Sequence, residues 1–506
     1  MQERKFAIGI VFIVTLIGFL PLIVMLFHAL SGLEYEKVLE LFAQKAIAES
    51  FVQSLLLSAF VAFTSTLIGT ALGLLFGKTD FFASKLFVSL FIVPLLVPPY
   101  ILALGWIDII GVEGILSGWL FGFWGVAWVL ICVYLPIPMV LNMLFLKQIA
   151  PNLENMAKLY TNEWGVLRFI TLPLIMPAFV LSFLLLFILS FSEYSVANVL
   201  RFHSFSLESF VRFSAFYDFK SAMLLSLPML LVAALVLLIE RLYVEKNLTK
   251  MKTPQRINII ELSKNQQLFF SVLLVCFVFV VLVLPLFSLF SHVNLQSLAL
   301  AFDKALSPLI NSFVYSLSAA ALLTLLGFLS AYVISFKFLS LWCFFDGGIV
   351  FLFTLPATVL GIGFILLYNR VWLDFIYASA FIVILAYVGK YLALAVKMSE
   401  HRLQQMPSSM LEAAKLSGAS WFDTLRYILI PQSKKMLITV FVVSFIFSFR
   451  ESTLTMLLYP AGHETLSVYI ITQMANGRPE IIAALSLIMV LSIVVPFFIF
   501  MRRKVV

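Results

Sequence analysis

Long apolar runs alternate with short polar segments along the whole chain. A helix needs about 20 apolar residues to cross the roughly 30 Å hydrocarbon core of a bilayer, and these runs are close to that length. We therefore predict an all-α integral membrane protein with about 12 transmembrane helices, six in each half of the chain. The predicted spans are residues 6–29, 51–77, 84–108, 119–146, 170–192, 221–239, 268–291, 311–335, 342–368, 375–397, 431–457 and 480–501.

The composition agrees with a chain that is solvated by lipid. Hydrophobic residues make up 63% of the 506 residues and charged residues only 11%, whereas soluble domains are about half apolar and about a quarter charged. The formal net charge is +8, but no basic patch with interleaved stacking aromatics is present. We therefore expect no nucleic acid among the partners.

Lysine and arginine lie mainly beside alternate ends of the predicted spans. Loops rich in these residues stay in the cytoplasm, so we predict that both termini and the basic segments are cytoplasmic. The first apolar run is interpreted as a retained span, because no convincing small-residue cleavage site follows it. The basic positions are Lys78, Lys85 and the segments 147–168, 246–264, 397–426 and 502–504.

A polar insert with helix-forming residues interrupts the apolar pattern at residues 411–431, LEAAKLSGASWFDTLRYILIP. Gly418 is predicted to end a first short helix, and Ser420 and Asp423 have the spacing that caps a second one. Pro431 stands where the next apolar run begins, a position that tolerates the missing N–H of proline. We therefore expect two short helices at a bend, held between two spans.

The insert has a near-copy at residues 153–173, LENMAKLYTNEWGVLRFITLP. A constant step of 258 residues separates matching positions, which indicates a tandem duplication. We predict a first half at residues 1–240, a cytoplasmic linker at 241–267 and a second half at 268–506. The matching pairs are Glu154 and Glu412, Pro173 and Pro431, Glu193 and Glu451, Pro98 and Pro356, and Gly105 and Gly363.

The spacing of Glu-Ala-Ala, Gly and the final Ile-x-Leu-Pro resembles the signature loop of the membrane subunits of type I ATP-binding cassette importers. In the second insert Ile430 stands in for the leucine. The first insert departs further, with Asn155, Met156 and Tyr160 in place of the two alanines and the glycine. The resemblance assigns ATPase coupling to Glu154, Ala157, Ile170, Leu172 and Pro173 in a first loop (147–173), and to Glu412, Ala413, Ala414, Gly418, Ile428 and Pro431 in a second loop (398–431).

In this family each signature loop is a cytoplasmic coupling helix that sits in a groove of a separate ATP-hydrolysing subunit. The resemblance implies two six-helix transmembrane domains in one permease chain, in a bacterial plasma (inner) membrane. Two copies of the ATPase, an extracytoplasmic solute-binding protein and the lipid bilayer are the implied partners. The chain is not expected to be an enzyme or to hold a cofactor; ATP and Mg belong to the ATPase. Consistently, the run from Gly73 to Thr79 has three residues between its glycines, whereas a phosphate-binding loop needs four.

Glu193 and Glu451 lie near the outer end of the span that follows each signature loop. Charged groups within a membrane usually face a protein interior or a water-filled path. These two residues are therefore candidates for the lining of the pathway of a cationic or metal-bearing substrate. The alternative is that each glutamate pairs with a neighbour or lies at the external interface. Pro98 and Pro356 interrupt their spans at matching places, either as part of the pathway or as ordinary kinks.

The five histidines and three cysteines lack metal-ligand spacing, so no metal site is expected. Within the importer family, fused twelve-span chains of this layout resemble the iron(III) permeases, and residues 238–242 and 455–487 carry that likeness. The resemblance implies iron(III) uptake, with thiamine, polyamine and phosphonate-type importers as alternatives. A secondary transporter with two six-span halves is the alternative from a different class.

Overall fold

The computed structural model describes residues 2–31, 35–245 and 259–505. Regular structure in these residues is helical, apart from an isolated bridge between Thr79 and Ile260. Ten of the described helices are long and apolar enough to cross a membrane, and two bent pairs of shorter helices bring the number to twelve if each pair is one span. The predicted all-α membrane fold is confirmed.

Two of the predicted spans, 84–108 and 342–368, are sharply bent pairs of helices. Pro98 and Pro356 stand in the breaks with extended backbone, at ψ 132° and 142°. Proline keeps the residue before it out of the helical region and has no N–H to donate, so each run turns where the sequence predicted an interruption. The pairs are α5 (Ser84–Leu96) with α6 (Pro99–Ile110), at 94°, and α20 (Trp342–Thr354) with α21 (Ala357–Tyr368), at 105°.

Packing divides the chain into two compact units, and each is described by itself. Unit 2 comprises residues 36–211 and 231–295. Its further elements are α3 (Tyr35–Ala43), α4 (Lys45–Lys78), α7 (Ser117–Leu120), α8 (Phe123–Tyr134), α9 (Pro136–Leu146), α10 (Pro151–Lys158), α11 (Glu163–Val166), η2 (Leu167–Thr171), α12 (Leu172–Phe191), α13 (Ser195–Val199), most of α14 (Phe205–Ser214), η3 (Glu240–Glu245), α17 (Lys264–Val278), η4 (Phe279–Val283) and α18 (Leu284–Ser291).

Unit 1 comprises the residues up to 35, residues 212–230 and the chain from 296 onward. Helix α15 (Phe219–Ile239) begins in this unit and ends in unit 2. The further elements of unit 1 are α1 (Gln2–Val14), η1 (Thr15–Phe19), α2 (Leu20–Leu30), α19 (Leu295–Ser335), η5 (Val371–Leu373), α22 (Asp374–Tyr377), α23 (Phe381–Gln404), α24 (Ser408–Leu416), α25 (Trp421–Asp423), η6 (Thr424–Leu429), α26 (Ile430–Phe449), α27 (Thr453–Leu458), α28 (Leu466–Asn476) and α29 (Pro479–Val505).

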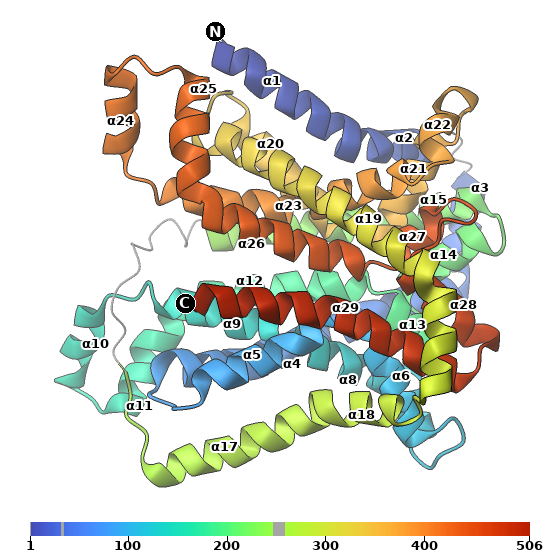
Figure 1. Ribbon diagram of the computed structural model, residues 1–506, viewed down its shortest axis with the longest axis horizontal. Helices are drawn as coiled ribbons and strands as arrows, with labels where there is room; N and C mark the ends of the chain where they lie inside the picture. The colour runs from blue at the N-terminus through green and yellow to red at the C-terminus, as the bar shows by residue number, and fades with distance from the viewer. Residues whose placement is uncertain (1, 32–34, 246–258, 506) are drawn as a thin grey trace. The chain divides into compact units, whose positions relative to one another are not determined.

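Each unit takes its first span from the other half of the predicted duplication. In unit 1, η1 and α2 pack against α20, α21 and α23 of the second half (Figure 1). In unit 2, α17, η4 and α18 pack against α5 and α6 of the first half. The packing units therefore cut across the halves 1–240 and 268–506, whose boundaries stay a prediction. Of the predicted linker 241–267, residues 246–258 lie outside the described residues.

In each unit a glycine allows two helices to pack closely against each other. In unit 2, a Cβ built on Gly105 would lie 2.3 Å from the carbonyl oxygen of Pro285 on α18. In unit 1, a Cβ on Gly363 would lie 2.7 Å from the carbonyl oxygen of Pro21 on α2. Because the obstacle is backbone, a side chain at either glycine would push the two helices apart.

A π-helical segment precedes a proline at four places in the described chain. A proline ring crowds the preceding turn and offers no N–H to it, and the wider π turn gives the helix room to continue. The second helix of each insert is therefore not separate, as predicted, but continues into a span. In the second insert that span is Trp421–Phe449, so the prediction of 431–457 was wrong at both ends. The four pairs are η1 with Pro21, η2 with Pro173, η4 with Pro285 and η6 with Pro431.

We expect Gly105→Val and Gly363→Val each to lower the free energy of unfolding by about 1–3 kcal/mol, the usual cost of overpacking. Gly9→Val is the matched control, because a Cβ on Gly9 meets nothing within 4 Å. Thermal unfolding of the detergent-solubilised chain measures the difference. Equal melting temperatures for all three variants would contradict the close approach of these helices.

Candidate functional site

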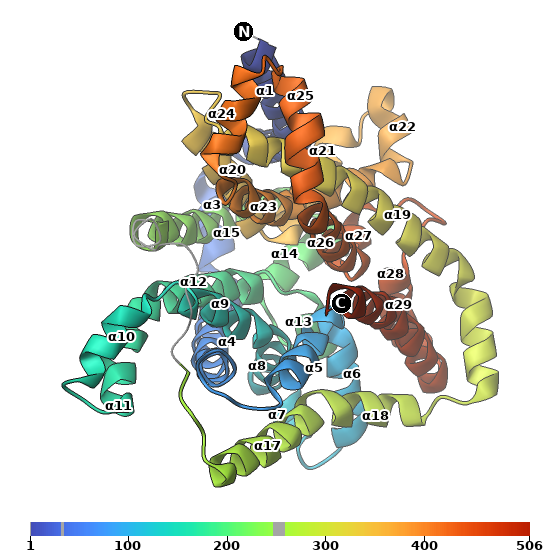
Figure 2. The same ribbon diagram turned by 60° about the vertical axis from the view of Figure 1, so that its left-hand side comes forward.

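The first signature loop projects beyond the end of α12 (Figure 2). Helix α10 is followed by a turn and by α11, whose N-cap residue is Asn162. The Asn162 side chain accepts a hydrogen bond from the N–H of Gly165 at 2.9 Å and so caps α11. The chain then runs through η2 into α12, so the loop is a bent helical pair whose second arm is part of a span.

Glu154 of this loop is buried, with 2% of its surface exposed. Its Oε1 atom forms an ion pair with the Nζ atom of Lys78, which is itself 5% exposed at the end of α4. The same oxygen accepts a hydrogen bond from the hydroxyl of Thr171 at 2.8 Å. The signature carboxylate of the first loop is thus enclosed between α10, α4 and η2.

Helix α24 of the second loop ends at Leu416, and Gly418 breaks the helix just beyond it, as the sequence predicted. This residue has φ +79°, a left-handed conformation that glycine adopts without strain. The N–H of Ala419 donates to the carbonyl of Ala414 at 3.0 Å, which is the hydrogen bond of a left-handed helix terminus. Ser420 and Asp423 then form the predicted capping box at the start of α25. The first loop has no left-handed residue at the matching Tyr160, so its two arms are joined by a different turn.

The second signature carboxylate has the opposite environment to the first. Glu412 is exposed on α24, and its side chain has no hydrogen-bond or ion-pair partner among the described residues. The remaining signature positions are exposed at Ala413, Gly418, Pro173 and Pro431, half-buried at Ala157, Ile170, Leu172 and Ile428, and buried at Ala414.

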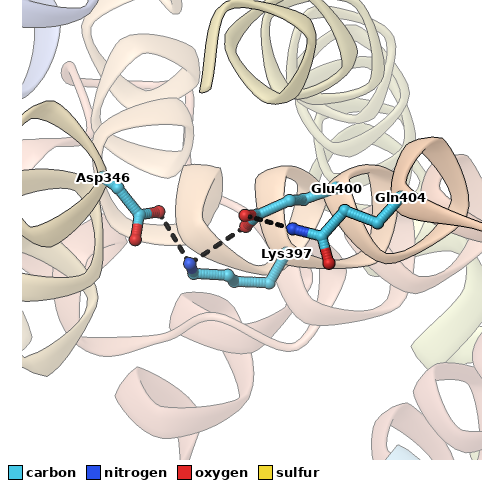
Figure 3. A network of polar contacts seen from close by, with 4 residues as sticks. All are labelled: Asp346, Lys397, Glu400 and Gln404. Atoms are coloured by element: carbon cyan, nitrogen blue, oxygen red, sulfur yellow. Dashed lines mark hydrogen bonds and ion pairs between the residues drawn. The ribbon is translucent and has the colours of Figure 1, made fainter. Parts of the chain in front are cut away.

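The base of the second loop is fixed by charged contacts (Figure 3). The Nζ atom of Lys397 on α23 lies 2.6 Å from Asp346 on α20 and 3.0 Å from Glu400. The guanidinium of Arg402 donates to the carbonyl of Gln432 at 3.1 Å, which joins the two ends of the loop. These contacts hold the spans that carry the loop, and none of them involves a residue of α24.

The two loops share a pair of stacked side chains at the point where they enter the span. The guanidinium of Arg168 lies 5.6 Å from the ring centre of Phe169, and Arg426 lies 5.6 Å from that of Tyr427. An arginine over an aromatic ring presents a charged head and an apolar body, which suits the membrane interface. The match at a step of 258 residues places the same kind of interface residues at both loops.

Glu193 and Glu451 occupy equivalent places in their own units. Glu193 accepts hydrogen bonds from the N–H of Ser195 at 2.9 Å and from the hydroxyl of Tyr134 at 3.3 Å. Glu451 accepts one from the N–H of Leu454 at 3.1 Å and one from the hydroxyl of Tyr391. Each carboxylate therefore gives a hydrogen-bond partner to a backbone N–H group in the first turn of a short helix, α13 for Glu193 and α27 for Glu451. Both remain half-buried rather than enclosed.

A buried lysine near Glu451 escaped the sequence analysis. Lys390 is 7% exposed, and its Nζ atom donates to the carbonyls of Phe353, at 3.2 Å, and of Leu355, where α20 ends before Pro356. Its positive charge in the interior of the predicted span 375–397, away from Lys397 at the end of that span, was the available signal. The matching residue of the first half is Cys132, so the polar character of this site belongs to the second half.

Three known proteins are similar to the chain over most of its length. It is 26% identical to "Ferric transport system permease protein FbpB" of Actinobacillus pleuropneumoniae, over 98% of this chain and 78% of that protein. It is also 26% identical to "Putative ferric transport system permease protein FbpB 1" of Haemophilus influenzae, over 93% of this chain and 80% of that protein. Identity to "Fe(3+)-transport system permease protein FbpB 2" of the same species is 22%, over 91% and 90% of the two chains.

Residues 323–503, which include the second signature loop, match the family model of the binding-protein-dependent transport system inner membrane component. The chain therefore resembles the permease subunits of ATP-binding cassette importers. Members of this family are multi-pass inner-membrane components, not the catalytic subunit, and they work with an ATPase and a solute-binding protein. The resemblance read from the signature loops is confirmed for the importer class.

We expect Gly418→Val to open the end of α24 in this permease, since a β-branched residue in the left-handed region costs about 1–2 kcal/mol. A Cβ at this position meets nothing within 4 Å, so the cost is one of backbone conformation only. Hydrogen exchange of the Ala419 amide measures it and should become faster. Gly418→Asn is the control, because asparagine tolerates this region; equal exchange in the two variants would contradict the assignment.

Proposed function

We propose that this permease forms the translocation pathway of an iron(III) importer and is driven by two copies of a separate ATPase. The observation that supports iron(III) as the substrate is the similarity of more than nine-tenths of the chain to ferric and Fe(3+) permeases. Iron(III) is the cargo in this proposal. ATP and Mg are bound by the ATPase, and this chain holds no cofactor of its own.

Exposed apolar side chains on both signature loops support docking to the ATPase. The first loop exposes Met156, Leu159, Tyr160 and Trp164 at 64%, 80%, 90% and 66% of their surfaces. On the second loop Leu416 is 90% exposed. Exposed apolar residues that cluster on a projecting segment are typical of a protein interface, and coupling would bury them in a groove of the partner.

The orientation of the chain is part of the proposal, with both termini and both loops in the cytoplasm. In unit 1 the ring of Phe6 lies 4.7 Å from that of Trp421, at the base of the second loop. Figure 1 shows the N-terminal end of α1 and the C-terminal end of α29 towards the left, the side from which α24 projects. A common side for the termini and this loop agrees with the distribution of lysine and arginine.

Glu193, Glu451, Pro98 and Pro356 are proposed to belong to the substrate pathway. Carboxylate and phenol oxygens are hard ligands that suit highly charged cations, and each glutamate here is joined to a tyrosine hydroxyl. The breaks at the two prolines are buried and leave helix ends without helical hydrogen bonds, which proteins tolerate at membrane depth beside cavities or within packed interiors.

Glu412→Lys should weaken retention of the ATPase by about tenfold or more, because hydrogen bonds to charged groups contribute roughly 1.5–3 kcal/mol. Co-purification of the ATPase with a tagged permease measures this, with Glu480→Lys, an exposed charge reversal outside the loops, as the control. Full retention in Glu412→Lys would refute coupling through this residue.

Gly418→Pro should leave ATP hydrolysis running with little uptake, since proline cannot adopt a positive φ.

The double variant Glu193→Gln, Glu451→Gln should lower iron(III) uptake by roughly tenfold through loss of both charges, with ATPase retention unchanged. Uptake of radioactive iron(III) by cells that express the whole transporter is the measurement. Glu480→Gln serves as the control. Unchanged uptake in the double variant would remove the two glutamates from the pathway.

A further inference from the structure

The two signature carboxylates, Glu154 and Glu412, match in sequence but differ in their exposure and in their bonding partners. Glu154 is 2% exposed and bound to Lys78 and Thr171, whereas Glu412 is exposed and has no partner among the described residues. We propose that Lys78, Glu154 and Thr171 form an internal anchor that fixes α10 to the end of α4, and that only Glu412 offers a signature carboxylate to the ATPase. This inference rests on the proposed function, because it presumes the ATPase partner.

The second half lacks both residues that enclose Glu154. The position of Thr171 corresponds, at the 258-residue step, to Leu429, an apolar residue with 0% exposure. Residues 50–54 (SFVQS) match residues 312–316 (SFVYS) at a step of 262 residues, so the position of Lys78 corresponds to Phe336 at the 258-residue step or to Ser340 at the 262-residue step. The lysine nearest in sequence to these positions is Lys337, and its Nζ atom lies over the ring of Trp342, 4.9 Å from the ring centre. The described residues therefore contain no equivalent anchor for Glu412.

Lys78 is itself held in place by the chain that leads into α17. The N–H of Ile260 donates to the carbonyl of Lys78 at 2.8 Å, and the N–H of Asp80 donates to the carbonyl of Ile260 at 3.2 Å. The carboxylate of Asp80 in turn accepts from the N–H of Leu262 at 2.8 Å. The anchor therefore joins three segments of unit 2: the end of α4, the first loop and the entry to α17.

Glu154 would leave its partners only at a high cost. Breaking a buried ion pair leaves an uncompensated charge on the other side chain, and here Lys78 has 5% exposure. The first loop would instead dock through its exposed apolar residues, so Glu154 and Lys78 act as positioning residues. Movement of α10 on the ATPase would then pass directly to α4.

A neutralised pair distinguishes an internal anchor from a contact with the ATPase. Lys78→Met and Glu154→Gln alone should each reduce uptake per ATP hydrolysed, because each leaves a buried group without its partner. The combined variant Lys78→Met, Glu154→Gln should regain uptake per ATP hydrolysed to within about twofold of wild type, since both charges are gone, and should retain the ATPase. Glu412→Gln should weaken retention about tenfold with no rescue by Lys78→Met. Lys78→Arg, which keeps the charge, should keep most of the coupling.

Glu163→Gln is the matched control in the same loop, because Glu163 forms an exposed ion pair with Lys158 at 2.6 Å and should change little. If Glu154→Gln weakens retention as much as Glu412→Gln, and Lys78→Met does not restore it, the anchor is refuted. If no ATPase co-purifies with the wild-type chain, the proposed function fails, which is a different result.

The wild-type chain provides a test that needs no variant. A water-soluble carbodiimide with a small amine should modify Glu412 and Glu163 and spare Glu154, as read by mass spectrometry of the permease in nanodiscs. Adding the ATPase should protect Glu412. Modification of Glu154 that the ATPase then blocks would overturn the proposal.

Discussion

Backbone N–H and C=O groups within the hydrocarbon core must find partners inside the protein, and the irregular parts of this permease follow from that constraint. Where α20 breaks before Pro356, Lys390 donates to the freed carbonyls of Phe353 and Leu355. Where α13 and α27 begin, Glu193 and Glu451 accept from the first N–H groups. At each of these helix ends a charged side chain offsets a backbone group that has no helical partner.

The two halves keep this architecture in common and differ in how charges fix their loops. The bent pairs, the π turns before proline and the arginine–aromatic pairs recur at matching positions. The ion pairs do not: Lys78 holds α10 itself, whereas Lys397 holds only the spans below α24. Removing one partner of a buried ion pair costs about 3–5 kcal/mol because it leaves an uncompensated charge, so the Lys78–Glu154 pair restricts where the first loop can lie. The half with the degenerate signature is therefore the half with the internal anchor.

The length of apolar runs and the 258-residue step were sufficient to predict the membrane fold, the duplication and the place of both loops. Local signals also worked where the cause is local, as at Gly418 and at the Ser420–Asp423 cap. The start of the span at Trp421 was missed because a π turn lets a helix continue through a polar segment that ends in proline. The burial of Glu154 was missed for a different reason: its partner lies 76 residues away in sequence, and no local pattern links them.

The exchange of first spans bears on why both halves are found in one chain. Unit 1 needs α2 to cover α21, and unit 2 needs α18 to cover α6, through glycines that accept only a bare backbone contact. Neither half of the duplication contains all the helices of one unit, so each half alone would leave an apolar face uncovered. Joining the halves raises the effective concentration of each exchanged span for its site. Covalent fusion therefore favours the paired state in which two loops, one anchored and one free, are available together.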